Sequence, residues 1–276
     1  MSSNPKDARD LLAFYVEAGA DALLGEEAVD RMADELAPPP AGGRPDSEAV
    51  RVRGSSPDRS QRFAPPAAAE GKALVSPDAA AMAAREAART AANLDELRAL
   101  LETFEGCALR ITATQLVFAD GNPQGRVMFV GEAPGHEEDI SGRPFVGRSG
   151  QLLDRMIAAI GLDRTKVYIA NVVPWRPPGN RTPTPQETAI CLPFIRRQIE
   201  LANPDVLVCL GGPSAQTLLG IRDGITRTRG RWFAYDTGTR DIRAIATFHP
   251  AFLLRSPLQK RLVWRDFMAI KKALTQ

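Results

Sequence analysis

Cysteine and histidine are scarce, with three cysteines and two histidines in 276 residues. The cysteines, Cys107, Cys191 and Cys209, are too few to form a disulfide framework. The first residues are polar and unlike a signal peptide, and no apolar run approaches the length of a membrane span. We therefore expect a cytoplasmic protein with no membrane partner.

An excess of charge is also lacking, because the formal net charge is only +2. So small a value permits a nucleic-acid partner but does not argue for one, since local patches matter more than the total. The hydrophobic content of 44% is ordinary for a globular protein. A chain of this length can form one large core plus an extension.

The beginning of the chain differs in composition from the rest. An amphipathic pattern reaching residue 36 predicts an N-terminal helical segment, 1–36. Residues 37–78 are rich in proline, glycine and serine and predict a disordered linker. The domain that carries the function is then 79–276. It should open with an alanine-rich helix at 79–92, followed by a second helix with Asn93 as N-cap and Glu96 three residues on.

Strand and helix patterns alternate through the remainder of this domain. Apolar runs predict strands at 127–130, 167–173, 206–210 and 242–248. Helical spacing predicts helices at 151–160, 185–201, 214–219 and about 258–274. Such alternation favours a three-layer α/β/α fold around a central, mainly parallel sheet of four strands. The loops after the strands then meet at one edge, where open α/β sheets bind ligands.

The loop after the first strand is the most distinctive stretch. It begins with Gly131-Glu132-Ala133-Pro134-Gly135, carries three acidic residues at 137–139 and runs to Gly147. Glycines let the backbone approach a ligand closely, and Pro134 stiffens the turn. The length and charge of the loop favour a ligand-binding role over an ordinary strand-to-helix connection.

The second loop begins at Asn171, near a strand end. Its carboxamide offers one acceptor and two donors, which matches the edge of a nucleobase or an amide. The alternative is a turn or capping asparagine, which this residue alone would favour. Arg176 and Arg181 follow on a proline-rich stretch. They are suited to backbone phosphates, or else are routine charges on a solvated loop.

The remaining two loops offer a histidine, an apolar tip and free amides. His249 follows the last strand and is a candidate acid, base or hydrogen-bond donor, although lone histidines are more often structural. Leu253 and Leu254 next to Arg255 resemble an apolar wedge flanked by a phosphate contact, or else ordinary core packing. The amides preceding the helix at Ser214 could hold a phosphate, which is a weak signal.

Several of these motifs together resemble the family-four branch of the uracil-DNA glycosylases. They are the Gly131–Gly135 stretch, Gly-Arg-Pro-Phe-Val-Gly at 142–147, Gly-Gln-Leu-Leu-Asp at 150–154, the Asn171 loop with Arg-Pro-Pro, and His249-Pro250-Ala251. The order and spacing agree with the family over roughly 104–276, and not over the first hundred or so residues. The resemblance implies a uracil-DNA glycosylase-like fold. It also implies an enzyme that hydrolyses the N-glycosidic bond of uracil in single- or double-stranded DNA, releases free uracil and acts as a monomer.

The resemblance also implies a role for individual residues. Phe145 should stack on an extruded uracil, Asn171 should bind its O4 and N3 edge, and His249 should donate toward O2. The loop backbone at Gly131 and Ala133 should line the pocket, and Glu138 should close it near C5. Leu253 or Leu254 should fill the gap left by the flipped nucleotide, because flipping costs unstacking energy.

The residue that handles the attacking water stays open between two carboxylates. The better-known branch of the superfamily has an aspartate at the position of Ala133. Family four has no aspartate there, and this chain agrees with family four. Glu132 and Glu138 are the carboxylates available, with Glu138 preferred for pocket shape. Relatives that become covalently trapped on DNA have a histidine in an insertion that this chain lacks, so we expect a monofunctional enzyme with normal turnover.

The resemblance further implies a four-iron cluster held by four cysteines, and here the chain departs from the family. Phe104 and Trp175 occupy two of the four positions, which leaves Cys107 and Cys191. Neither aromatic side chain can ligate iron. We therefore predict an enzyme with no cofactor and no metal site.

Two other classes of protein compete with the glycosylase interpretation. A glycosylase-like DNA-binding module without activity would lack the pocket residues, whereas Phe145, Asn171 and His249 are present. A nucleotide-binding enzyme would use the glycine-rich loop for phosphate, but no strong phosphate fingerprint supports it.

Overall fold

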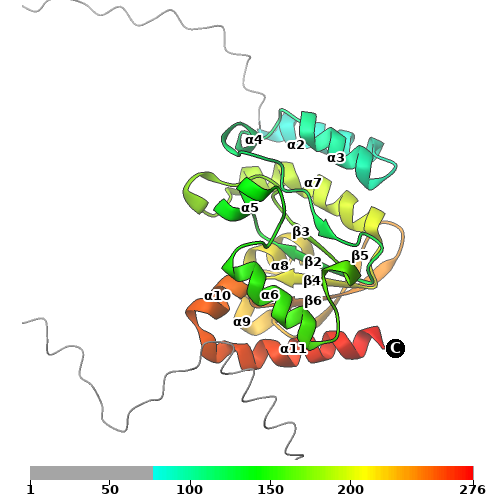
Figure 1. Cartoon of the computed structure of the whole chain (residues 1–276). Helices are drawn as coiled ribbons and strands as arrows, with labels where there is room; N and C mark the ends of the chain where they lie inside the picture. Colours follow the sequence, from blue (N-terminus) through cyan, green and yellow to red (C-terminus); the bar gives the residue numbers. More distant parts are fainter. Residues whose placement is uncertain (1–76, 276) are drawn as a thin grey trace, which may run out of the picture. The chain divides into compact units, whose positions relative to one another are not determined.

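The computed structural model describes residues 77–275, which form a three-layer α/β/α fold (Figure 1). The predicted helical segment 1–36 lies outside the described residues, as does the predicted linker up to residue 76. The last two residues of the predicted linker, Pro77 and Asp78, instead begin the first described helix. None of the helices in the described range has both the length and the apolar character that crossing a bilayer requires.

A six-stranded sheet forms the central layer, with strand order β1-β3-β2-β4-β6-β5. Its centre is the predicted parallel set β2 (Val127–Gly131), β3 (Val167–Asn171), β4 (Val206–Leu210) and β6 (Asp241–Thr247). Two strands that the sequence did not predict, β1 (Asp120–Gly121) and β5 (Trp232–Asp236), add to the edges in antiparallel orientation. Neither has the continuous apolar run of β2 and β4, because β1 has two residues and β5 is mostly accessible.

Helices cover both faces of this sheet (Figure 1). One face carries α2 (Pro77–Thr90), α3 (Leu94–Thr103), α7 (Pro185–Ala202) and α8 (Gly212–Leu219). The other carries α6 (Arg148–Ala159), α10 (Pro250–Arg255) and α11 (Lys260–Leu274). Shorter turns of helix are α4 (Leu109–Thr112), α5 (His136–Ser141), α9 (Ile225–Thr228), η2 (Arg164–Lys166), η3 (Pro178–Asn180) and η4 (Pro257–Gln259).

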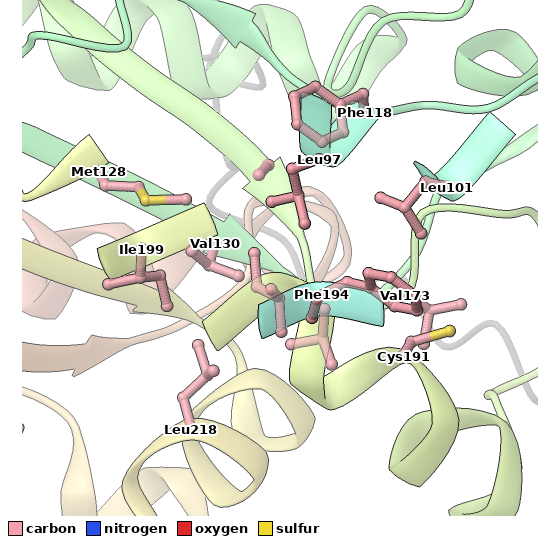
Figure 2. Close-up of a cluster of buried hydrophobic side chains, with 14 of the residues drawn as sticks. Leu97, Leu101, Phe118, Met128, Val130, Val173, Cys191, Phe194, Ile199 and Leu218 are labelled. Carbon is pink, nitrogen blue, oxygen red and sulfur yellow. The ribbon is translucent and has the colours of Figure 1, made fainter. Parts of the chain in front are cut away.

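Alternate residues of each central strand enter opposite hydrophobic cores. In β2, Met128 and Val130 pack with α3 and α7, as Figure 2 shows, whereas Val127 and Phe129 pack with α6 and α11. All five residues of β2 are therefore buried. Burial on both faces explains why the parallel strands appear in the sequence as continuous apolar runs.

The predicted N-cap of α3 is confirmed. The Asn93 side chain accepts a hydrogen bond from the Glu96 amide at 2.9 Å, and the Glu96 carboxylate reaches back to the amide of Ala92. These contacts satisfy backbone donors that the first turn of a helix leaves without partners.

Candidate active site

A cavity of about 700 Å³ opens at the carboxyl edge of the parallel strands. Its walls come from the loops that follow β2, β3, β4 and β6, as expected for a ligand site in an open α/β sheet. It brings together eight of the residues predicted to form the site: Glu132, Ala133, Glu138, Phe145, Asn171, Arg181, His249 and Arg255.

Phe145 is held in an uncommon backbone conformation. Its φ angle is 55°, in the left-handed region that costs a residue other than glycine roughly 1–2 kcal/mol. The side chain is buried, and its ring centroid lies 5.4 Å from that of His249. Strain at an aromatic residue that lines the cavity indicates that the surrounding contacts dictate where the ring lies.

Gly131 makes room for two side chains of the cavity. It pairs in register with Asn171 on the neighbouring strand. A Cβ atom at Gly131 would lie 2.4 Å from Oδ1 of Asn171 and 2.6 Å from the ring of Phe145. Gly131 does not line the cavity itself, so its contribution to the site is the absence of a side chain.

Asn171 ends β3 and is 4% exposed, with its side chain in the cavity wall. Beyond the strands, the amides of Val172 and Val173 donate to the carbonyls of Gly131 and Glu132, each at 3.0 Å. The first two loops thus continue to pair past the sheet. This pairing fixes the Asn171 side chain relative to the loop that carries Phe145.

His249 is the N-cap of α10, and its protonation state follows from that position. The amide of Ala251 donates to Nδ1 of His249 at 3.1 Å, so this nitrogen is an acceptor and the neutral ring carries its proton on Nε2. Burial lowers the pKa of His249 to about 4, and the positive charge of Arg255 adds to the effect. Glu138 opposes both. The histidine is therefore neutral at physiological pH.

Glu138 lines the cavity, yet its carboxylate is occupied by backbone donors. One oxygen accepts from the amides of Val146 and Gly147 at 3.0 and 3.1 Å, and the other from the amide of Gly135 at 3.1 Å. These contacts hold both ends of the loop together. Little of the carboxylate's accepting capacity is left for a water molecule.

Glu132 is the other carboxylate in the cavity wall, and unlike Glu138 it has an oxygen with no backbone donor in the described part of the chain. Its Oε1 is buried and has no hydrogen-bond partner among the described residues. Burial raises the pKa of Glu132 above its ordinary value. A buried acceptor without a partner is costly, and perturbed carboxylates in clefts are frequent at functional sites.

Three predicted DNA-contacting arginines differ in how they are bound. Arg255 lines the cavity. Arg181 also lines it but forms a two-pronged ion pair with Glu187, at 2.6 and 2.8 Å. Arg176 lies outside the cavity wall. Its guanidinium contacts Asn180 at 2.7 Å and Nδ1 of His136 at 3.0 Å, so it ties the second loop to the start of α5.

Two of the predicted DNA contacts, Ser214 and Leu253, have buried side chains. Ser214 is fully buried, and its hydroxyl donates to the carbonyl of Val130 at 2.7 Å. Leu253 is 1% exposed and packs in the core beneath α10, whereas Leu254 is 39% exposed. The two leucines were alternatives for one role, and burial leaves Leu254 as the accessible one.

The sequence matches known proteins over this same region. A family model described as the Uracil DNA glycosylase superfamily matches residues 118–268, more than half of the chain. The chain belongs to the uracil-DNA glycosylase superfamily.

Individual relatives in the superfamily agree with the family model. The type-4 uracil-DNA glycosylase of Thermotoga maritima is 45% identical over 168 residues, covering 60% of this chain and 86% of that protein. The type-4 enzyme of Archaeoglobus fulgidus is 40% identical over 182 residues, with coverage of 64% and 92%. That of Sulfurisphaera tokodaii is 37% identical over 185 residues, with coverage of 65% and 84%.

The cysteines of this superfamily member do not fit a four-thiolate cluster. Cys107 and Cys191 are buried side by side, with 4.0 Å between their sulfur atoms, and the thiol of Cys191 lowers the pKa of Cys107 by donating to it. Cys209 lies apart in β4, where burial raises its pKa to about 12. Within residues 77–275, no group of three or more histidine, cysteine, aspartate or glutamate side chains is placed to hold a metal ion.

Aromatic side chains pack in the same region. Phe104 packs edge-on against Phe194, with ring centroids 5.0 Å apart, and Trp175 is among the largest fully buried side chains. A Cβ at Gly106 would meet the Phe104 ring at 2.5 Å, so the glycine accommodates this ring.

Sequence reasoning missed part of the cavity wall. Ile225 and Thr226 of α9 line it, together with Phe248 and Phe252. Three β-branched residues in a four-residue helix give no helical pattern, so nothing local indicated α9. Gly211, with φ of 96°, lies against His249, where a Cβ would approach the histidine Cβ to 3.1 Å.

Proposed function

We propose that this protein is a type-4-like uracil-DNA glycosylase that flips uracil out of DNA and hydrolyses its N-glycosidic bond. The products are free uracil and an abasic site, which begins base excision repair. The observation that carries the proposal is the convergence of Phe145, Asn171 and His249 on one cavity. The superfamily match and the relatives named type-4 uracil-DNA glycosylases support it.

Base selection rests on Phe145 and Asn171. The Phe145 ring offers a face on which the extruded base stacks. The Asn171 carboxamide donates to O4 of uracil and accepts from N3–H. Cytosine presents an amino donor and an acceptor nitrogen at these two positions, so each contact would be mismatched. A buried site built for one hydrogen-bond pattern rejects the opposite pattern strongly.

Cleavage leaves the bonding electron pair on the departing uracil and positive charge on the sugar. In our proposal Nε2–H of the neutral His249 donates to O2, where the negative charge of the uracil anion accumulates. A preorganised donor at a developing anion is typically the largest single contribution to such a reaction. Because the histidine donates without itself being charged, its low pKa is compatible with this role.

Water then adds to C1′ of the sugar, and its proton must be accepted. We assign this role to Glu132, because Oε1 has no partner among the described residues and burial raises the pKa of the carboxyl. Glu138 is assigned the other role. It shapes the pocket near C5 of the base, where thymine carries a methyl group, by holding Gly135 and Val146.

The DNA strand is proposed to run past Arg181 and Arg255, with Leu254 occupying the gap left by the base. Arg181 would exchange its partner Glu187 for a phosphate. Ser214 contributes no side-chain contact in this proposal, whereas the amides before it stay available as a phosphate site.

The proposed enzyme holds no iron–sulfur cluster. Two facing thiols, with no third ligand beside them among residues 77–275, do not complete a four-iron site, in which every iron needs its own thiolate. Packing of Phe104 and Trp175 takes over the stabilising role of a metal in this region. The cytoplasmic location and the monomeric state stay predictions from the sequence.

The test is base release from single- and double-stranded oligonucleotides that contain uracil, hypoxanthine, xanthine or thymine. We expect release of uracil without added metal. Asn171→Ala should lower the single-turnover rate, and the loss of transition-state stabilisation should be roughly 2–4 kcal/mol. A protein that binds uracil-containing DNA but releases no base would instead be an inactive DNA-binding module.

A further inference from the structure

Arg164 lies outside the cavity wall yet contacts the backbone that carries the stacking residue. It begins the η2 turn immediately before β3. One of its terminal nitrogens donates to the carbonyl of Pro144 at 3.2 Å, and the other donates to the carbonyl of Phe145. A single guanidinium therefore holds the two peptide groups that flank Phe145, one on each side of the strained position.

Two carboxylates fix that guanidinium in turn. Its Nε donates to Asp154 of α6 at 2.7 Å, and Nη1 donates to Asp120 of β1. The Arg164 side chain is 24% exposed, so these pairs are only partly screened by water. Contacts to several partners at once suit arginine, because its planar fork of donors is rigid.

A group of opposite charge also holds the backbone on the C-terminal side of Phe145. Glu138 accepts from the amides of Val146 and Gly147, so the peptide group between Phe145 and Val146 is held by Arg164 through its carbonyl and by Glu138 through its amide. Beneath the loop, a Cβ at Gly150 would lie 1.7 Å from the Phe145 carbonyl oxygen. That oxygen is thus confined between the Gly150 backbone and Arg164. These contacts account for a phenylalanine in the left-handed region, at φ 55°.

We infer that Arg164 is a positioning residue for base recognition. It holds Phe145 in the conformation that presents its ring to uracil, and it links that ring to the strand that ends in Asn171. This inference rests on the proposed function. It predicts that loss of Arg164 weakens uracil binding and cleavage more than it weakens binding to DNA.

The test compares Arg164→Gln and Arg164→Lys with Arg240→Gln. Arg240 is a matched control, since its Nη2 also donates to two carbonyls and a carboxylate: those of Asn203, Pro204 and Asp205. These residues precede β4, at the amino end of the sheet and away from the cavity. Four quantities are measured for each variant: thermal midpoint, single-turnover rate on uracil-containing DNA, inhibition by free uracil, and affinity for uracil-free DNA.

Arg164→Gln should lower the single-turnover rate by about 10- to 100-fold, because misplacing a positioned group by about 1 Å has effects of that size. The inhibition constant of uracil should rise by a similar factor, while affinity for uracil-free DNA stays within about twofold. Arg164→Lys should keep the thermal midpoint closer to that of the unmodified protein but lose most of the rate, since one ammonium cannot serve two carboxylates and two carbonyls. Arg240→Gln should change the thermal midpoint alone.

The inference is overturned if Arg164→Gln keeps its rate and uracil inhibition, or if DNA affinity falls as much as the rate. If Arg164→Gln does not fold, Arg164→Lys decides on the same readouts. An unmodified protein that releases no uracil overturns the proposed function and this inference with it. An active protein with an unaffected Arg164→Gln variant overturns the inference alone.

Discussion

The Ala251 amide donates to Nδ1 of His249 at 3.1 Å, which leaves the ring proton on Nε2 and no hydrogen on Nδ1. Protonation would place a second hydrogen against that amide. The contact with the Ala251 amide therefore orients the ring and disfavours its charged form. Burial acts in the same direction and lowers the pKa of His249 to about 4.

The first prediction concerns stability against pH. The folded pKa of His249 lies below the value of about 6.5 expected when unfolded, so the unfolded state binds the extra proton first. The contribution of neutral His249 to the free energy of unfolding is fully present above pH 6.5. It is lost as the pH drops toward 4, and the loss is at most about 3 kcal/mol. Urea unfolding at pH 7.5, 6 and 5 should show this slope in the unmodified protein and a smaller one in His249→Gln. Equal slopes in both proteins would contradict the assignment.

The second prediction is that Glu132→Gln lowers activity without lowering stability. The raised pKa means that Glu132 binds its proton more tightly in the folded state than in the unfolded state. The free energy of unfolding therefore falls as the pH rises from the unfolded pKa to the folded one, and the charged carboxylate opposes folding at pH 8. We expect a single-turnover rate lower by about 10²- to 10⁴-fold, as for loss of a general base. The unfolding free energy should be unchanged or higher. Glu137→Gln, on the exposed face of the same loop, is the control and should match the unmodified protein.

The third prediction uses the space at Gly131. In Gly131→Ala the new methyl group meets Oδ1 of Asn171 at 2.4 Å and the Phe145 ring at 2.6 Å, so both groups that read the base must move. Uracil excision should fall by about a hundredfold. Gly224→Ala is a suitable control, because a Cβ there meets nothing within 4 Å and φ is −66°. A Gly131→Ala variant with normal excision would show that the base binds elsewhere.

The fourth prediction separates the two neighbouring leucines. Leu254→Ala should leave stability within about 0.5 kcal/mol, because the side chain is exposed. It should slow excision from double-stranded DNA more than from single strands, where no gap in a duplex needs to be filled. Leu253→Ala should instead cost about 2–5 kcal/mol of unfolding free energy, since it opens a hole in the core. Identical excision by Leu254→Ala on both substrates would remove the wedge assignment.

The fifth prediction concerns iron. The protein purified without oxygen should contain no stoichiometric iron or sulfide and should lack absorption near roughly 400 nm. Chelators should leave activity unchanged. Phe104→Cys combined with Trp175→Cys is the informative counterpart, because it restores thiols near Cys107 and Cys191 and should promote iron uptake. Iron in the unmodified protein would show that two thiols suffice.

The sequence predicted the sheet well because its strands are buried on both faces. The run Val127-Met128-Phe129-Val130 has no polar position, and its ends are marked by turn residues. The edge strand β1 could not be found in this way, since two residues carry no pattern. Strand prediction here succeeded where the local pattern and the tertiary environment impose the same requirement.

The sequence predicted the loops that form the site, but it did not predict the contacts that hold those loops in place. Asn171 and His249 stand at strand ends, so a local pattern places them at the right edge. The burial of Ser214 depends on a carbonyl 84 positions earlier, and the contact between Arg164 and Phe145 spans 19 positions. Such long-range contacts leave no signal in the spacing of residues along the chain.

Gly131 and Asn171 are paired in register, so the proposed recognition of the base depends on how β2 and β3 are aligned. Successive side chains of a strand face opposite sides, so a slip of β3 by one residue would put Ala170 or Val172 where the carboxamide belongs. On the proposed function, a single residue inserted or deleted in the η2 turn would therefore abolish the choice of base.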